Sequence, residues 1–200
     1  MSALLPVYAL CRHRIDHDGG GVVTLVGVSA CPLNCRWCLN PEARDGAAAA
    51  RLYTPEALYD ALAVDDQATN GGVTFGGGEP LMHADFLRAF IRLVNGRWRV
   101  RAETSLHVPP ENAVLPLDEY IVDIKDMNPA IYHAYTGGNA ALARENLAAV
   151  LRAGSADRVL ARVPLIPDYN TEGDVQKSVE ALRAMGVTRV DPFRYLRKEA

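Results

Sequence analysis

Hydrophobic residues fall along this chain in two kinds of segment, short β-branched runs and longer stretches with a helical period. Val22–Val28 is a nearly continuous apolar run, which is typical of a strand buried on both faces. His83–Asn95 instead carries apolar residues three and four positions apart, which predicts an amphipathic helix. Both kinds of segment recur, so strands and helices should alternate along the chain.

The alternation predicts a parallel α/β fold. The expected strands are 22–28, 73–75, 99–104, 120–125, 159–165 and 189–191 or slightly beyond. The expected helices begin at Thr54, with a proline at the first helical position, and span 83–95, 139–153 and 171–185. A closed eight-fold barrel typically needs about 250 residues. With 200 residues, the chain better fits one domain, residues 1–200, that forms an open barrel of six strand–helix units.

Composition narrows the class of protein. Apolar residues make up 49% of the chain, which is enough for a large core. The net charge of −3 offers no basic surface for nucleic acid, and no apolar run reaches membrane-spanning length. The first residues lack the pattern of a secretory signal, and the cysteines therefore suggest free thiols in a reducing cytoplasm.

Three cysteines, Cys31, Cys35 and Cys38, follow directly after the first expected strand. Three thiolates on one short loop can hold three irons of a [4Fe–4S] cluster and leave the fourth iron open, whereas electron-carrying clusters usually have four protein ligands. A structural zinc site normally has four ligands, which are arranged in pairs. Cys11 and His13 lie upstream and could complete such a site only if the strand between them and the cysteine loop allowed it. The spacing therefore favours an iron–sulfur cluster over zinc.

Other polar and glycine residues also follow expected strands. In parallel α/β folds, ligands bind at the carboxyl ends of the strands. Because these ends meet at one rim, we expect the residues that lie there to converge on the cysteine loop. These candidates are Gly76, Gly77, Gly78, Glu79, Thr104, Ser105, Asp123, Lys125 and Arg162.

The cysteine motif, with Trp37 before its last cysteine, resembles the cluster motif of the radical S-adenosylmethionine (SAM) enzymes. Val73–Pro80 resembles the Gly-Gly-Glu motif of that superfamily, in the form found in glycyl-radical-enzyme activating enzymes such as the pyruvate formate-lyase activating enzyme. Further segments of the chain resemble the same group in order and spacing: Glu103–Ser105, Asp123–Lys125, Tyr135–Gly137 and Arg162–Pro167. The resemblance spans about residues 13–191 and implies a partial (β/α)6 parallel barrel of the radical SAM type.

The resemblance implies two cofactors, a [4Fe–4S] cluster on the three cysteines and SAM on its open iron. It assigns the glycines to close approach of the backbone to the methionine end of SAM, because a Cβ atom would clash there. Glu79 would brace that loop or help to receive the amino group, and Trp37 would pack against adenine. Lys125 and Arg162 would contact the carboxylate and ribose of SAM. Thr104, Ser105 and Asp123 would line the ribose or a nearby cation site.

The implied activity is reductive cleavage of SAM, followed by hydrogen abstraction from a glycine of a partner glycyl radical enzyme. The implied electron donor is reduced flavodoxin or ferredoxin. Two alternatives stay open: a radical SAM enzyme acting on a peptide or small molecule, and a non-catalytic iron–sulfur or zinc protein that senses or carries electrons. The chain departs from the activating group at Asp18–Gly21, which lacks the usual proline and arginine, and at Glu103, where an aspartate is usual.

Overall fold

The computed structural model describes residues 3–15, 21–64 and 72–195, so most of the departing stretch Asp18–Gly21 lies outside the described residues. One eight-stranded sheet forms the centre of the molecule, in the order β3-β1-β2-β4-β5-β6-β7-β8. Its six parallel strands confirm the six that the sequence predicts. They are β2 (Val22–Val28), β4 (Gly72–Gly77), β5 (Val100–Thr104), β6 (Glu119–Asp123), β7 (Val159–Leu165) and β8 (Arg189–Arg194).

Two antiparallel strands extend the sheet beyond the expected six. β1 (Leu5–Ile15) pairs with β2, and β3 (Arg51–Tyr53) pairs with β1. The sequence pattern missed both, because the second half of β1 is mostly polar and exposed, and β3 has only three residues. The sheet is open, with β3 at one edge and β8 at the other. This arrangement agrees with a partial barrel.

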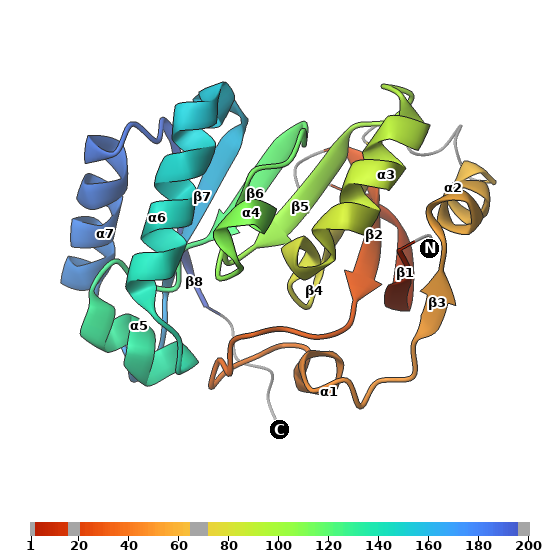
Figure 1. Cartoon of the computed structure of the whole chain (residues 1–200). Helices are drawn as coiled ribbons and strands as arrows, with labels where there is room; N and C mark the ends of the chain where they lie inside the picture. Colours follow the sequence, from red (N-terminus) through yellow and green to blue (C-terminus); the bar gives the residue numbers. More distant parts are fainter. Residues whose placement is uncertain (1–2, 16–20, 65–71, 196–200) are drawn as a thin grey trace.

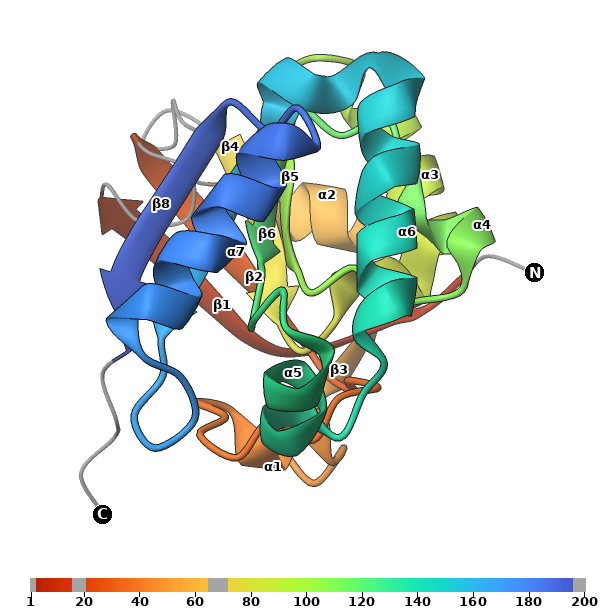
Figure 2. The same cartoon turned by 90° about the vertical axis from the view of Figure 1, so that its left-hand side faces the viewer.

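The four expected helices are present, and three short ones were missed. α2 (Pro55–Ala63) begins after Thr54, whose side chain accepts a hydrogen bond from the backbone N–H of Ala57. α3, α6 and α7 lie on the same side of the sheet (Figures 1 and 2). The remaining bounds are α1 (Pro41–Arg44), α3 (Ala84–Val94), α4 (Pro110–Ala113), α5 (Pro129–Thr136), α6 (Ala140–Val150) and α7 (Glu172–Ala184), with a 3₁₀ turn at Pro80–His83 and a π turn at Leu151–Ser155.

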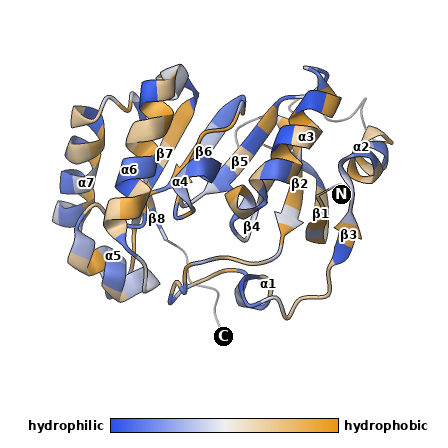
Figure 3. Cartoon of the chain, in the orientation of Figure 1, coloured by the Kyte–Doolittle hydropathy of each residue, from blue (hydrophilic) through white to orange (hydrophobic). Residues whose placement is uncertain are grey.

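Side chains on the two faces of the parallel strands differ in character. Phe75, Ala102 and Val122 belong to the main hydrophobic core beneath the helices, and the strands are largely orange behind helices with blue outer faces in Figure 3. Alternate positions point to the other face, as strand geometry requires. There Glu119 binds Arg101 at 3.2 Å and Arg189 at 2.6 Å, which links β5, β6 and β8. The face without helices is therefore polar.

Among the described residues, none of the helices has the length and apolar character needed to span a membrane.

Candidate functional site

The cysteine loop crosses the carboxyl ends of the strands between β2 and α1 (Figure 1). Cys31, Cys35 and Cys38 are free thiols on this loop, and each is half-buried. The backbone N–H of Asn34 donates to the carbonyl of Thr136 at 2.8 Å, and that of Arg36 donates to Tyr135 at 3.0 Å. The end of α5 therefore fixes the loop on both sides of Cys35.

Trp37 fixes the other half of the loop, and packing of its ring against adenine stays a prediction. Its indole N–H donates to the carbonyl of Pro167 at 3.3 Å, and its own carbonyl accepts from the hydroxyl of Tyr195. These two contacts come from the segments after β7 and after β8. The loop is thus anchored to elements that are more than 100 residues distant in the sequence.

The three thiols do not form a site for a single metal ion. Within residues 3–15, 21–64 and 72–195, no three His, Cys, Asp or Glu side chains are grouped closely enough to hold one ion. A four-iron cluster binds each thiolate at a different iron, so its ligands are spread more widely. Burial raises the pKa of Cys31 to about 12 and also raises the pKa of Cys35. Metal binding would therefore have to displace their protons.

Gly76 and Gly77 face protein atoms rather than an empty cradle. A Cβ atom on Gly76 would lie 2.6 Å from the Oε2 atom of Glu103, and one on Gly77 would lie 2.4 Å from the hydroxyl of Tyr8. Gly77 also has a φ of +89°, which side chains rarely adopt. Both glycines are thus needed for packing against β1 and β5, and close approach of their backbone to SAM stays a prediction. Glu103 reaches this loop with its longer carboxylate.

Gly78 joins the glycine loop to the start of the cysteine loop. Its N–H donates to the carbonyl of Val28 at 2.9 Å, and the N–H of Glu79 donates to that of Ala30 at 2.9 Å. A Cβ atom on Gly78 would lie 2.3 Å from the Ala30 oxygen. Glycine is therefore required for the two loops to meet.

Glu79 holds the adjacent strand ends together, as expected of a bracing residue. Its Oε1 atom accepts from the hydroxyl of Thr104 at 2.6 Å and from the N–H of Leu81 at 3.2 Å. Its Oε2 atom accepts from the N–H of Ser105 at 2.8 Å and from that hydroxyl at 2.7 Å. Glu79 is 1% exposed, and burial raises its pKa although the hydrogen bonds from Thr104 and Ser105 oppose the shift. The hydroxyl protons of Thr104 and Ser105 are thus engaged by Glu79, and a contact of either residue with a ribose or a cation stays a prediction.

Lys125 and Asp123 form a close ion pair beyond the end of β6. Burial lowers the pKa of Lys125, but the charges of Asp123 and Cys35 outweigh it, so that the pKa is raised well above its ordinary value. Lys125 therefore carries a positive charge beside the cysteine loop. The Oδ1 atom of Asp123 is buried, and no described group forms a hydrogen bond with it.

Arg162 is engaged by β8. Its Nε atom lies 3.3 Å from the Oδ2 atom of Asp191, and its guanidinium lies 4.2 Å above the centre of the Phe193 ring. Since its side chain is 38% exposed, it remains accessible from the face without helices. The internal ion pair is present, and a contact with SAM stays a prediction.

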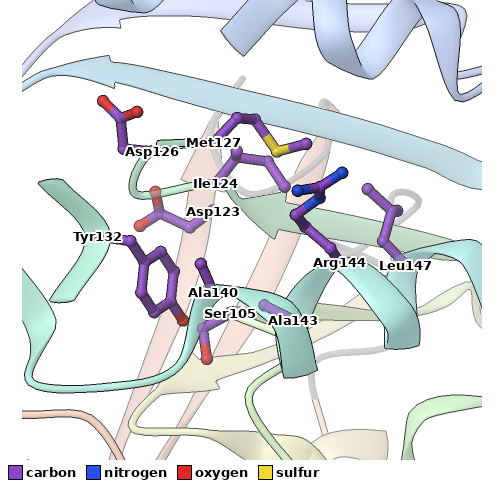
Figure 4. Close-up of a pocket in the computed structure, with 10 residues that line it drawn as sticks. All are labelled: Ser105, Asp123, Ile124, Asp126, Met127, Tyr132, Ala140, Ala143, Arg144 and Leu147. Atoms are coloured by element: carbon purple, nitrogen blue, oxygen red, sulfur yellow. The ribbon is translucent and has the colours of Figure 1, made fainter. Parts of the chain in front are cut away.

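A small pocket lies beside these residues, between β6, α5 and α6 (Figure 4). Its polar lining includes Ser105, Asp123, Asp126, Tyr132 and Arg144. Sequence reasoning did not single out Tyr132, although it lies only three positions before the Tyr135–Gly137 segment. The spacing places both tyrosines on one face of α5, which was a usable signal.

The family model described as the radical SAM superfamily matches residues 25–190, most of the chain. The chain belongs to the radical SAM superfamily. This confirms the predicted enzyme class and its two cofactors, a [4Fe–4S] cluster and SAM.

The curated relatives of this radical SAM protein include several activating enzymes. It is 28% identical to the isethionate sulfite-lyase activating enzyme of Desulfovibrio desulfuricans, over 83% of this chain and 74% of that one. It is 27% identical to the pyruvate formate-lyase 2-activating enzyme of Escherichia coli, over 92% and 75%. It is 25% identical to a 4-hydroxyphenylacetate decarboxylase activating enzyme of Clostridioides difficile, over 79% and 71%. The predicted resemblance to this group is confirmed.

Solved structures confirm the fold alone, because their sequence identities are low. SuiB of Streptococcus suis, solved with SAM bound, has a TM-score of 0.63 and 12% identity, over 85% of this chain and 38% of SuiB. The anSMEcpe enzyme with bound AdoMet has a TM-score of 0.58 and 18% identity, over 84% and 50%. The radical SAM protein thus spans well under half the length of SuiB, and about three quarters of the first two curated relatives.

Proposed function

We propose that this protein is an activating enzyme that uses SAM to abstract a hydrogen atom from a glycine of a partner glycyl radical enzyme. The observation that carries this proposal is the similarity to several activating enzymes over most of the chain. The open sheet supports it, because its polar face lacks covering helices and leaves access for a segment of a large partner.

In this proposal Cys31, Cys35 and Cys38 hold the cluster, and SAM binds between the cysteine loop and the strand ends. When bound, the reduced cluster supplies one electron to the sulfonium of SAM, which splits into methionine and a 5′-deoxyadenosyl radical that takes a hydrogen atom from the substrate. The protein's task is to position these groups and to exclude water.

The chain provides positive charge and rigidity for this task. Lys125 is held beside the cysteine loop in its charged form and can attract the carboxylate of SAM. Arg162 can reach the same ligand from β7 if it shares its ion pair with Asp191. Glu79 does not need to touch SAM, because it already locks Thr104 and Ser105 into one rigid rim.

The proposal also includes an electron donor and a cellular compartment. Reduced flavodoxin or ferredoxin would deliver the electron, and the cytoplasm would be the compartment. A peptide or small-molecule substrate remains the alternative activity. SuiB, solved with its precursor peptide SuiA, shares the fold but is only 14% identical, which is too distant to favour that alternative.

The test is anaerobic incubation of the reconstituted, dithionite-reduced protein with SAM. We expect an EPR signal of the reduced cluster that changes when SAM is added, and formation of 5′-deoxyadenosine. With a candidate glycyl radical enzyme encoded nearby in the genome, we expect a glycyl radical doublet.

The two measurements separate the alternatives. Cleavage of SAM without a glycyl radical on any such partner would favour the peptide or small-molecule alternative. A cluster whose EPR signal is indifferent to SAM would overturn the proposal altogether.

A further inference from the structure

Tyr132 has a buried hydroxyl that no described group satisfies. The residue is 2% exposed, and its oxygen has no hydrogen-bond partner among the described residues. Buried polar groups in native proteins are nearly always paired, so an orphaned hydroxyl points to a missing partner. Two other buried polar atoms of this region, the hydroxyl of Tyr135 and the Oδ1 atom of Asp123, also lack a described partner, whereas Glu79 accepts four hydrogen bonds.

The residues that surround Tyr132 belong in part to the cysteine loop, so a group bound by that loop is a candidate for the missing partner. Its ring packs against Leu33 and Ala140, and both Cys31 and Cys35 pack against this small cluster. After burial, the charge of Cys35 has the largest effect on the pKa of the Tyr132 hydroxyl, followed by the charges of Lys125, Glu79 and Cys31. In Figure 4 the ring extends from α5 across the pocket beside Ser105.

The position of Tyr132 relative to the loop is fixed by contacts on both sides. The last carbonyls of α5 accept hydrogen bonds from the loop N–H groups of Asn34 and Arg36. The ring of His107 stacks on that of Tyr132, with their centres 6.4 Å apart. The hydroxyl therefore cannot swing away to solvent without undocking α5.

The neutral phenol of Tyr132 carries a proton that it can donate in a hydrogen bond. The sulfur atoms of a bound iron–sulfur cluster are acceptors, and hydrogen bonds to them raise its reduction potential because they stabilise the more negative reduced form.

We propose that the Tyr132 hydroxyl donates a hydrogen bond to a sulfur of the cluster held by Cys31 and Cys35, and that it thereby makes the cluster easier to reduce. This inference rests on the proposed function for the cluster itself. It makes Tyr132 a positioning residue that tunes the electron-transfer step.

The experiment compares two tyrosines that are equally buried. Tyr120 is fully buried in the core, but its hydroxyl donates to the carbonyl of Leu115 at 2.7 Å and does not face the cysteine loop. Reduction potentials of the reconstituted wild type, Tyr132→Phe and Tyr120→Phe are measured by EPR-monitored redox titration without SAM.

For Tyr132→Phe we expect the equilibrium constant for reduction to fall about tenfold, which is about 59 mV for a one-electron couple. For Tyr120→Phe we expect an unchanged potential and a lower unfolding midpoint. An unchanged potential in Tyr132→Phe overturns the inference, and weaker SAM binding at that unchanged potential would assign the hydroxyl to SAM instead. If the wild type holds no [4Fe–4S] cluster, the proposed function fails and this inference fails with it.

A second measurement applies if Tyr132→Phe does not retain its cluster. Protein labelled with ring-deuterated tyrosine, in the wild type and in Tyr135→Phe, is examined by deuterium ENDOR of the reduced cluster. We expect a coupling to ring deuterons that persists in Tyr135→Phe. Its loss in Tyr135→Phe, or its absence from both proteins, would overturn the inference.

Discussion

The two sides of the candidate site differ in how completely the protein satisfies its own polar groups. Around Glu79, each carboxylate oxygen accepts two hydrogen bonds, from Thr104, Ser105 and Leu81. Beside the cysteine loop, the hydroxyl of Tyr132 and the Oδ1 atom of Asp123 are buried without partners among the described residues. The Glu79 carboxylate is thus satisfied by the protein itself, whereas the side of the cysteine loop leaves polar atoms for an added group.

This difference separates two kinds of motif residue. Residues on the Glu79 side shape the rim through contacts within the protein, and the contacts of several of them with SAM stay predictions. Residues on the cysteine side leave thiols and polar atoms available to added groups. A residue's place in a family motif therefore does not show whether it binds the ligand or braces the residues that do.

The largest effect on activity should come from a substitution in the cysteine loop. Cys35→Ala should abolish the cluster and reduce SAM cleavage to background, because two thiolates cannot hold the cluster in place of three. Iron content, EPR and 5′-deoxyadenosine formation measure this. Cys11→Ala is the control, since Cys11 is exposed on β1 outside the motif, and it should change none of them. If Cys35→Ala still cleaved SAM, the assignment of the cluster to three thiolates would be contradicted.

The next effect tests the packing of the glycine loop. Gly77→Ala should destabilise the fold by about 1–3 kcal/mol, because φ is positive and the hydroxyl of Tyr8 occupies the Cβ position. Gly46 also has a positive φ, but nothing lies within 4 Å of its Cβ position. Gly46→Ala should therefore cost less in urea denaturation of the cluster-free protein, and Tyr8→Ala should partly rescue Gly77→Ala. Equal losses in the two glycine variants would contradict the contact with Tyr8.

A smaller effect tests the completeness of the Glu79 side. In Glu79→Gln the new NH₂ group must face the backbone N–H of either Leu81 or Ser105, whichever way the amide is turned. One buried donor then loses its acceptor, which costs about 1–3 kcal/mol. Ser105→Ala should cost less, because the same carboxylate oxygen still accepts from the backbone. Urea denaturation measures both, and a Glu79→Gln variant as stable as wild type would show that the network is not complete.

The smallest effect is the pH dependence contributed by Glu79. Burial raises its folded-state pKa above the ordinary value of 4.5. Its contribution to stability is therefore fully present below pH 4.5 and is lost as the pH rises through the folded-state pKa. The difference in unfolding free energy between wild type and Glu79→Gln should fall as the pH is raised from 4.5. A difference that grows with pH would mean that the hydrogen bonds, and not burial, control this carboxyl.

Much of the architecture was readable from local patterns. The β-branched run at Val22–Val28 and the helical period at His83–Asn95 each indicate which of their residues are buried. Both elements are present, and their ends lie within one or two residues of the predicted ends. The strand β1 was not readable, because only its first half alternates between buried and exposed positions and its pairing partner determines the rest. The helix α5 has eight residues and a weak pattern, so it too was missed.

The sequence by itself determined the family, the parallel strands and the convergence of the motifs at their carboxyl ends, because residue spacing and strand period are local properties. Only the tertiary structure decided what each motif residue contacts. It placed Tyr8 over Gly77, paired Arg162 with Asp191, and packed Tyr132 against Leu33 of the cysteine loop. Each of these contacts joins elements far apart in the chain, and their geometry depends on how whole strands and helices pack rather than on any neighbouring residue.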